Sequence, residues 1–461
     1  MSILVENYRI MRVHFIAIGG SAMHNLAIAL HQKGAQVTGS DDAIFEPSKS
    51  RLAKHGLFPK TIGWNAAVIT KYVDAVILGM HAKADNPELL KAQELGIEIF
   101  SYPEYLYEQS KLKSRVVIGG SHGKTTITSM ILHVLHYHNK QVDYMVGAQL
   151  EGFETMVHLT EENDFMVLEG DEYLSSPIDL RPKFHLYQPN IALLSGIAWD
   201  HINVFKTLED YEAQFSIFID KIVKGGILIY NEEDPTVKRL VEASENQIRK
   251  IPYITPTYTV ENGETFIETN EGPMPLEIFG AHNLSNLAGA KWVCQNMAID
   301  EDDFYEAIAT FKGASKRLEK IAETSNSVAF KDFAHSPSKV TATTNATKQQ
   351  FPNRKLIACL ELHTYSSLSS QFLKQYEGAL NSADEAVVFY SPKALEIKKM
   401  QPISVEDIKQ AFGKSDLKVY TEPQEFKDYL FNQQLDNKTV LLMSSGNYGG
   451  LDFEEVKAMF I

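Results

Sequence analysis

A glycine-rich segment that contains a lysine and two threonines is the part of the sequence best suited to chemistry. It reads Gly119-Gly120-Ser121-His122-Gly123-Lys124-Thr125-Thr126, follows an apolar run at 115–118 and precedes a helical pattern. In a strand–loop–helix of this kind, backbone N–H groups and the helix N-terminus surround phosphate oxygens. Lys124 can then reach the β- and γ-phosphates of ATP, and the Thr125 hydroxyl can ligate Mg²⁺. The segment predicts an ATP phosphate site; an incidental turn is the alternative, because Ile118 replaces the first glycine of the usual motif.

A carboxylate and an imidazole follow two other predicted strands. Glu169 ends the apolar run at 165–168, and His201 comes after the run at 191–194. Because open α/β sheets bind ligands at the carboxyl ends of their strands, Glu169 is well placed to approach the phosphate loop. Taken alone, Glu169 caps a turn about as readily, and an isolated histidine such as His201 is more often a polar residue without a ligand. Together with Lys124, the two residues favour a magnesium-assisted site.

Three segments with alternating strand and helix patterns must position these residues. The predicted strands are at 13–18, 36–39 and 73–78, then at 115–118, 165–168, 191–194 and 227–230, and finally at 328–331, 355–360, 386–390 and 439–443. This alternation predicts an α/β protein with parallel sheets and crossover helices. We expect three domains: a Rossmann-like domain at 1–112, a central domain with a P-loop ATPase-like parallel sheet at 113–313, and a second Rossmann-like domain at 314–461. Residues 254–277 are expected to form hairpins.

Composition and charge exclude several classes of protein. The net charge of −15 argues against broad nucleic-acid binding, which needs a basic face. The sequence has no run of about 18 apolar residues that would predict a membrane span, and residues 1–12 lack a signal-peptide pattern. Cys294 and Cys359 are far apart and lack the spacing of a metal site, which fits a reducing compartment. We therefore expect a cytoplasmic protein, and the sequence does not predict its oligomeric state.

Five motifs in order resemble those of the Mur ligases of bacterial cell-wall synthesis, a family related to the folylpolyglutamate synthetases. They are the phosphate loop, Leu168-Glu169-Gly170-Asp171-Glu172, Asp200-His201, Gly280-Ala281-His282-Asn283, and Asp332-Phe333-Ala334-His335-Ser336-Pro337. The motifs extend over all three predicted domains. The resemblance implies an ADP-forming ligase in which ATP activates a carboxylate as an acyl phosphate and an amine then displaces the phosphate.

The resemblance also implies a role for each matching residue. It makes Lys124, Glu169 and His201 catalytic, with Thr125, Glu169 and His201 as ligands of Mg²⁺. Besides residues 120–126 of the loop, it implies ATP contacts by five later residues: His282 and Asn283 at the adenine, Arg317 at the phosphates, and Asp332 and His335 on the ribose side. Some Mur ligases carry a carbamylated lysine after the metal histidine, but the corresponding neighbourhood here is Gln214-Phe215-Ser216.

The first predicted domain has a glycine turn of its own, Ile18-Gly19-Gly20-Ser21-Ala22-Met23. It departs from the dinucleotide pattern G-x-G-x-x-G because His24 occupies the place of the last glycine, so a Rossmann dehydrogenase is a weaker alternative. In the Mur ligases this loop holds the pyrophosphate of a UDP-sugar. By resemblance, Gly19, Gly20, Ser21 and Ala22 contact the pyrophosphate, and Ser40, Asp41 and His81 flank the uridine. Folylpolyglutamate synthetases lack such a domain, which favours UDP-N-acetylmuramate as substrate.

Two amine substrates are compatible with this branch of the family. One type of enzyme adds L-alanine, and the other attaches the recycled murein tripeptide L-alanyl-γ-D-glutamyl-meso-diaminopimelate to the lactyl carboxylate. Met443-Ser444-Ser445-Gly446-Asn447-Tyr448-Gly449-Gly450 resembles the M-S-N-G-x-F-G-G of the tripeptide enzymes and favours the tripeptide. In contrast, His363 stands where those enzymes have an arginine. A nucleotide-binding protein without turnover is the non-enzymatic alternative, and the combination of Lys124, Glu169 and His201 argues against it.

Overall fold

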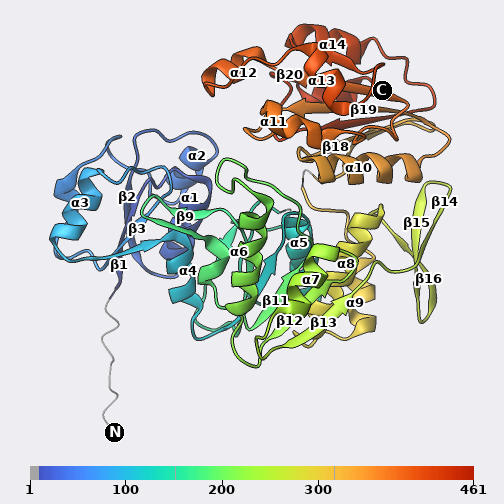
Figure 1. The fold of residues 1–461 in the computed structure, drawn as a ribbon. Helices are drawn as coiled ribbons and strands as arrows, with labels where there is room; N and C mark the ends of the chain where they lie inside the picture. The colour runs from blue at the N-terminus through green and yellow to red at the C-terminus, as the bar shows by residue number, and fades with distance from the viewer. Residues whose placement is uncertain (1–9, 151, 316, 461) are drawn as a thin grey trace.

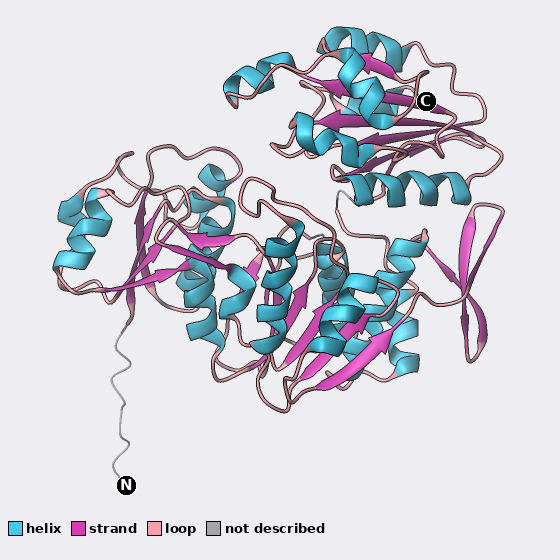
Figure 2. Cartoon of the chain, viewed as in Figure 1, coloured by secondary structure: helices cyan, strands magenta, loops and turns pink. Residues whose placement is uncertain are grey.

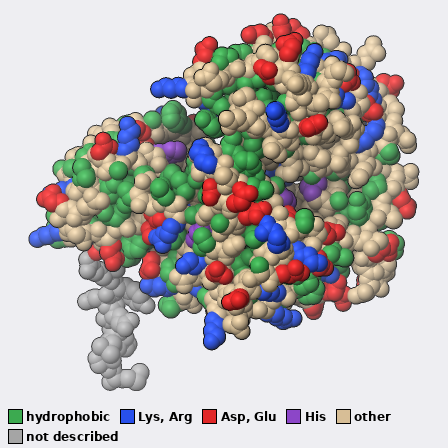
Figure 3. All heavy atoms as spheres, viewed as in Figure 1, with side chains coloured by type: hydrophobic (Ala, Val, Ile, Leu, Met, Phe, Trp, Pro, Cys, Tyr) green, Lys and Arg blue, Asp and Glu red, His purple; other side chains and the backbone are tan. Residues whose placement is uncertain are grey.

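The computed structural model describes residues 10–150, 152–315 and 317–460, and Figure 1 shows three α/β bodies in chain order. The prediction that residues 1–12 lack a signal-peptide pattern concerns mainly residues 1–9, which lie outside the described residues. Among the residues described, no helix is both long and apolar enough to cross a membrane. Figure 3 shows acidic and basic side chains interspersed over one face of the molecule.

The first body is a parallel sheet of four strands in the order β2-β1-β3-β4. The strands are β1 (Arg12–Ile16), β2 (Gln36–Ser40), β3 (Ala75–Leu78) and β4 (Glu98–Ser101). Its helices are α1 (Ser21–Gln32), α2 (Ser48–Lys54), α3 (Pro87–Glu94) and α4 (Tyr102–Ser110), with a 3₁₀ turn η1 (Ala66–Val68). Ala75 to Leu78 are at most 1% exposed, as expected for a strand that helices cover on both faces.

The central body has a sheet of seven strands in the order β13-β12-β11-β5-β8-β6-β7, parallel except for the β6–β7 pair. Its strands are β5 (Ser114–Gly119), β6 (Asp143–Met145), β7 (Val157–His158), β8 (Phe165–Gly170), β11 (Ile191–Leu194), β12 (Ile227–Asn231) and β13 (Arg249–Tyr253). The helices are α5 (Lys124–Tyr137), α6 (Leu208–Asp220), α7 (Pro235–Ala243), α8 (Ala281–Gln295) and α9 (Glu301–Ile308). Two smaller sheets are attached to this body: β9 (Leu174–Ser176) with β10 (Asp179–Pro182), followed by η2 (Lys183–Leu186), and the antiparallel β14 (Tyr258–Glu261), β15 (Glu264–Thr269) and β16 (Gly272–Leu276). The hairpins predicted at 254–277 are therefore confirmed.

The third body has a sheet of six strands in the order β17-β18-β22-β19-β20-β21, in which only β17 runs antiparallel to its neighbour. The strands are β17 (Glu319–Glu323), β18 (Val328–Asp332), β19 (Lys355–Leu362), β20 (Glu385–Tyr390), β21 (Lys418–Tyr420) and β22 (Lys438–Met443). The helices are α10 (Pro337–Gln350), α11 (Ser370–Leu373), α12 (Pro392–Ile397), α13 (Val405–Phe412), α14 (Pro423–Phe431) and α15 (Phe453–Ala458), with a 3₁₀ turn η3 (Lys374–Tyr376). In Figures 1 and 2, α10 lies on the side of this body that faces the central one.

The predicted α/β architecture with parallel sheets is confirmed, and the apolar runs predicted as strands form strands. The contact between α5 and α9 could not be predicted from the sequence. His133 Nε2 in α5 lies 3.0 Å from the carbonyl oxygen of Ala307, and Nε2 of His138, the residue after α5, lies 2.8 Å from that of Asp303. The helix α9 covers this part of α5, and a sequence pattern within one helix does not reveal a covering helix 170 residues away.

Candidate active site

The phosphate loop connects β5 to α5 and has the backbone of an anion-binding turn. Gly120 and Gly123 have φ angles of +134° and +80°, which favour glycine. A Cβ atom at Gly120 would lie 2.1 Å from Ser195 Oγ, and one at Gly123 would lie 2.4 Å from Asn286 Oδ1. The loop therefore packs against the end of β11 and the first turns of α8, and only glycine fits at these two positions.

Lys124, the first residue of α5, is held by two oxygen atoms. Its Nζ donates to the carbonyl oxygen of Gly120 and to Glu172 Oε2, both at 2.6 Å. The side chains of Lys124 and Glu172 are 14% and 1% exposed, so this is a buried ion pair. Burial disfavours the charge on Lys124, but the carboxylates of Glu172, Asp171 and Glu169 outweigh burial and raise the pKa of Lys124. The lysine therefore carries its positive charge in the absence of nucleotide.

Thr125 and Glu169, two of the residues that the resemblance implies as ligands of Mg²⁺, are in direct contact. Thr125 Oγ1 donates to Glu169 Oε1 at 2.8 Å, and the Gly147 N–H donates to Glu169 Oε2 at 2.7 Å. A Cβ atom at Gly147 would lie 2.9 Å from Glu169 Oε1, so a side chain at this position would displace the carboxylate. A hydroxyl and a carboxylate oxygen at this distance form a donor set that suits Mg²⁺, which prefers oxygen ligands.

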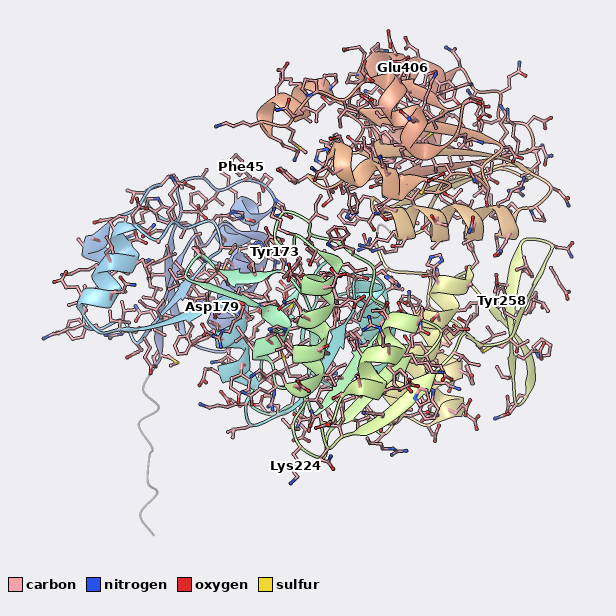
Figure 4. The ribbon with its side chains drawn as sticks, in the orientation of Figure 1. Phe45, Tyr173, Asp179, Lys224, Tyr258 and Glu406 are labelled. Atoms are coloured by element: carbon pink, nitrogen blue, oxygen red, sulfur yellow. The ribbon has the colours of Figure 1, made fainter. Side chains whose placement is uncertain are left out.

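His201 contacts a different carboxylate from the one that binds Thr125. Its Nε2 lies 3.6 Å from Glu172 Oε1, and its ring packs against Tyr173, labelled in Figure 4, with the centroids 5.1 Å apart. Glu172 Oε1 also accepts from the Tyr211 hydroxyl at 2.9 Å. Within 10–150, 152–315 and 317–460, no three His, Cys, Asp or Glu side chains are grouped closely enough to hold a metal. The structure thus brings His201 to Lys124 through Glu172, while Thr125 and Glu169 form a separate pair.

A cavity of about 200 Å³ opens above the phosphate loop and is lined by both the central and the third body. Eleven of the residues singled out in the sequence line it: Ser121, His122, Gly123, Lys124, Thr125, Thr126, Glu169, His282, Asn283, Arg317 and Asp332. Gly120, His201 and His335 are not among the lining residues. Sequence reasoning missed the other lining residues, which are Asn286, Ala334, Ser338, Lys339, Ala342 and Thr343. Asn286 could have been found from its position one helical turn after Asn283, on the same face of α8.

Burial controls protonation around this cavity. It lowers the pKa of His122, His282 and His335 to about 4 each, so these imidazoles are neutral at pH 7. Burial also raises the pKa of Asp332, although Arg317 and the N–H groups of Leu318 and Ala334, which bond to its carboxylate at 2.6 Å, act in the opposite direction.

In the first body, the carboxylate of Asp41 bonds to the backbone of the glycine turn. The Gly19 N–H donates to Asp41 Oδ2 at 2.7 Å, and burial raises the pKa of Asp41. The Ser40 carbonyl accepts from two backbone N–H groups at the end of β1. Gly20 precedes α1, and Ser21 and Ala22, its first residues, are exposed, as is His81 on the loop after β3. His24 Nδ1 lies 2.9 Å from the Gly20 carbonyl oxygen, so the residue that replaces the third glycine of the dinucleotide pattern stabilises the turn.

The turn after β22 meets the end of β19 in the third body. Glu361 Oε2 accepts from the Tyr448 N–H at 2.8 Å and from the Ser444 hydroxyl. His363 Nδ1 lies 3.6 Å from Glu361 Oε1, and its side chain is 45% exposed. The two segments that distinguish amine substrates in the sequence are therefore adjacent, at the carboxyl ends of neighbouring parallel strands.

Comparison with known proteins gives concordant matches. The sequence profile of the Mur ligase middle domain matches residues 118–294, and that of the Mur ligase family catalytic domain matches residues 12–113. The UDP-N-acetylmuramate–L-alanine ligase of a Sulfurihydrogenibium species is 31% identical over 82% of both chains. Two solved structures share the fold: a UDP-N-acetylmuramate–alanine ligase from Thermotoga maritima (22% identity, 98% of both chains, TM-score 0.68) and a murein peptide ligase from Psychrobacter arcticus (21% identity, 98% of this chain and 99% of that chain, TM-score 0.67).

Proposed function

This chain belongs to the Mur ligase family, whose members are ATP-dependent acid–amino acid ligases, and we propose that it joins the lactyl carboxylate of UDP-N-acetylmuramate to an amine. The observation that supports this most strongly is the cavity between the central and third bodies. It combines the phosphate loop, the Thr125–Glu169 pair and the two third-body residues Arg317 and Asp332.

The residues of the cavity fit the charges of the reaction. The carboxylate attacks the γ-phosphorus of ATP, the bond from this phosphorus to the bridging oxygen breaks, and ADP leaves. The neutral amine then attacks the acyl carbon and loses a proton, and inorganic phosphate leaves with the former carboxylate oxygen that had joined it to that carbon. Carboxylate and triphosphate repel each other, so Lys124 and Arg317 must offset their charge and hold them in line. Bound Mg²⁺, which Thr125 and Glu169 would hold, supplies further charge neutralisation.

Glu172 lies between His201 and Lys124 of the phosphate loop and contacts both. In the proposed site, Lys124 leaves Glu172 when a γ-phosphate offers a stronger partner, and His201 and Tyr211 then remain as the partners of the carboxylate. His201 is thus a positioning residue of the catalytic set that acts through Glu172.

Domain movement is part of the proposed cycle. The cavity of about 200 Å³ is smaller than the roughly 300–1,000 Å³ of typical small-molecule sites, and we propose that the third domain swings away to admit ATP. Closure afterwards excludes water that would hydrolyse the acyl phosphate.

In this scheme residues 1–112 bind the UDP-sugar, 113–313 bind ATP and 314–461 bind the amine. The UDP-sugar enters at Gly19 to Ala22, where it has to displace the Asp41 carboxylate from the Gly19 N–H. ATP and nucleotide sugars as substrates imply a cytoplasmic enzyme.

For the amine we favour the tripeptide L-alanyl-γ-D-glutamyl-meso-diaminopimelate. The support is the sequence of the turn at 443–450 and its contact with Glu361, which places this turn and His363 on one surface. L-Alanine is the second candidate, because the 31% identical relative is an L-alanine ligase.

A paired-substrate assay distinguishes these candidates. The full chain is incubated with Mg-ATP, UDP-N-acetylmuramate and either the tripeptide or L-alanine, and released phosphate is measured. Phosphate release that depends on the tripeptide supports the first candidate, and release with L-alanine alone supports the second. Binding of ATP with no product from either pair would contradict the ligase function and favour a nucleotide-binding protein.

A further inference from the structure

Lys339 is a partly buried cation that lines the cavity, and none of the family motifs contains it. It lies in the first turn of α10, two residues beyond the end of the Asp332–Pro337 motif, and lines the same cavity as Lys124 and Arg317. Its nearest anionic partner is Asp200, whose Oδ2 lies 3.6 Å from Lys339 Nζ, beyond normal hydrogen-bond length. The side chains of Lys339 and Asp200 are 22% and 13% exposed. This lysine is therefore desolvated but only loosely paired.

The charged groups around Lys339 associate it with the phosphate-loop end of the cavity. The Lys339 charge interacts with the charges of Lys124, Glu172 and Asp200. It also helps to lower the pKa of His122 in the phosphate loop. Burial, with repulsion from Lys124 and Arg317, lowers the pKa of Lys339 despite the attraction of Asp200. Three cations thus converge at the phosphate loop, an arrangement that is unfavourable without an anion and favourable around a polyphosphate.

The start of α10 reinforces this positive charge. Ser336, the N-cap residue of α10, makes no capping hydrogen bond with its side chain, and both Ser338 and Lys339 line the cavity. N–H groups in the first turn of a helix have no acceptor within the helix, and the helix dipole adds positive potential there. The lysine and the helix N-terminus therefore face the same space as the phosphate loop.

Contacts at the other end of α10 fix its position relative to the central body. Gln350 Nε2 donates to the Gly263 carbonyl at 2.6 Å, and Thr265 Oγ1 donates to Gln350 Oε1 at 2.9 Å. Figure 1 shows the β14–β16 sheet beside this end of the helix. Eleven residues at 1.5 Å each place Lys339 about 16 Å along the axis from Gln350. A rotation about this contact would move Lys339 toward or away from the phosphates while the hairpin end stays in place.

Given the ligase function proposed above, we propose that Lys339 is a third phosphate-binding cation, delivered by the third domain onto the γ-phosphate of ATP. Asp200 holds the lysine loosely, and in this proposal the γ-phosphate replaces Asp200 as its partner. Because the charge of Lys339 interacts with those of Lys124, Arg317 and Glu172, we assign its effect to the phosphoryl group that is transferred.

Calorimetric titration of the full chain tests this inference without turnover. Binding of Mg-ADP and of a non-hydrolysable imido analogue of Mg-ATP is compared in the wild type and in Lys339→Met, which keeps the aliphatic stem. Loss of a charge-assisted bond to the γ-phosphate should weaken binding of the triphosphate about tenfold or more and leave ADP binding within about twofold. Lys339→Arg should restore most of the difference.

The matched control is Lys348→Ala on the same helix, where an exposed ion pair with Asp384 is lost and neither affinity should change. Thermal unfolding checks that each variant is folded. If Lys339→Met loses equal affinity for ADP and for the triphosphate analogue, or loses affinity for neither, the assignment of Lys339 to the γ-phosphate is overturned. Failure of the ligase function would be distinguishable, since it would appear as absent phosphate release by the wild type in the paired-substrate assay.

Discussion

Lys124 and Glu172 form an ion pair of 2.6 Å in which the carboxylate is 1% exposed. Glu172 therefore neutralises the cation that the phosphate loop needs for ATP. Nucleotide binding has to exchange one anionic partner for another, and the buried Glu172 sets the free energy of that exchange.

Glu172→Gln should separate two effects of the carboxylate, which neutralises the buried Lys124 charge and competes with ATP for it. The buried Lys124 charge loses its counterion, so the free energy of unfolding of the nucleotide-free protein should fall by about 3 kcal/mol. ATP should then stabilise the variant more than the wild type, because its phosphates no longer compete with a carboxylate. Unfolding midpoints with and without Mg-ATP measure both effects. Tyr211→Phe, which removes the other bond to Glu172, is the control; equal ATP-induced shifts in Glu172→Gln and wild type would refute the exchange.

Glu169→Gln should affect magnesium dependence rather than folding. The amide can still accept from the Gly147 N–H, but it offers a cation a neutral oxygen. We expect the half-saturating Mg²⁺ concentration to rise and kcat to fall by about 100-fold or more. Phosphate release measured across a Mg²⁺ titration tests this, with Glu323→Gln on the exposed edge of β17 as the control. An unchanged Mg²⁺ curve would show that Glu169 is not a ligand.

Much of this site is predictable from sequence, because Glu169 lies near the end of β8, while Lys124 and Thr125 begin the helix that follows the neighbouring strand β5. Strand order then forces them together: β5 pairs with β8, and Ile118 is the register partner of Glu169. The association of His201 with Glu172 was not predictable, because it depends on a loop in which His201 has a φ of +53°. Nor was Lys339, which belongs to another domain. Its proximity to Lys124 depends on packing between domains, for which local sequence patterns carry no signal.

The contact between α10 and the β14–β16 sheet should control how tightly the third domain closes. Gln350→Ala removes both of its bonds and leaves Thr265, which is fully buried, without an acceptor. We expect KM for ATP to rise several-fold and the affinity for UDP-N-acetylmuramate to stay constant. Steady-state kinetics and direct UDP-sugar binding measure these quantities. Gln349→Ala, on the exposed face of the same turn, should match the wild type; equal effects from the two variants would argue against this contact as the pivot.

Stability should decrease with acidity below neutral pH because of the buried imidazoles. The pKa values of His122, His282 and His335 are lowered from 6.5 to about 4. Between these values the unfolded chain binds protons on the three side chains and the folded chain does not, so stability falls as pH falls from 6.5 to 4 and is fully present above 6.5. Thermal midpoints across this range should show the slope, and His282→Asn should reduce it. A midpoint independent of pH in this window would contradict the burial of these groups.

Transfer of oxygen from the carboxylate to phosphate is the most direct test of acyl-phosphate ligation in this cavity. UDP-N-acetylmuramate labelled with ¹⁸O in the lactyl carboxylate is incubated with Mg-ATP, the amine and the wild-type chain or Lys124→Ala, and the released phosphate is analysed by mass spectrometry. We predict one ¹⁸O atom in each phosphate released by the wild type, and no phosphate above background from Lys124→Ala, with the variant still folded and able to bind the UDP-sugar. Unlabelled phosphate from the wild type, or labelled phosphate at a normal rate from Lys124→Ala, would contradict the assignment of this site.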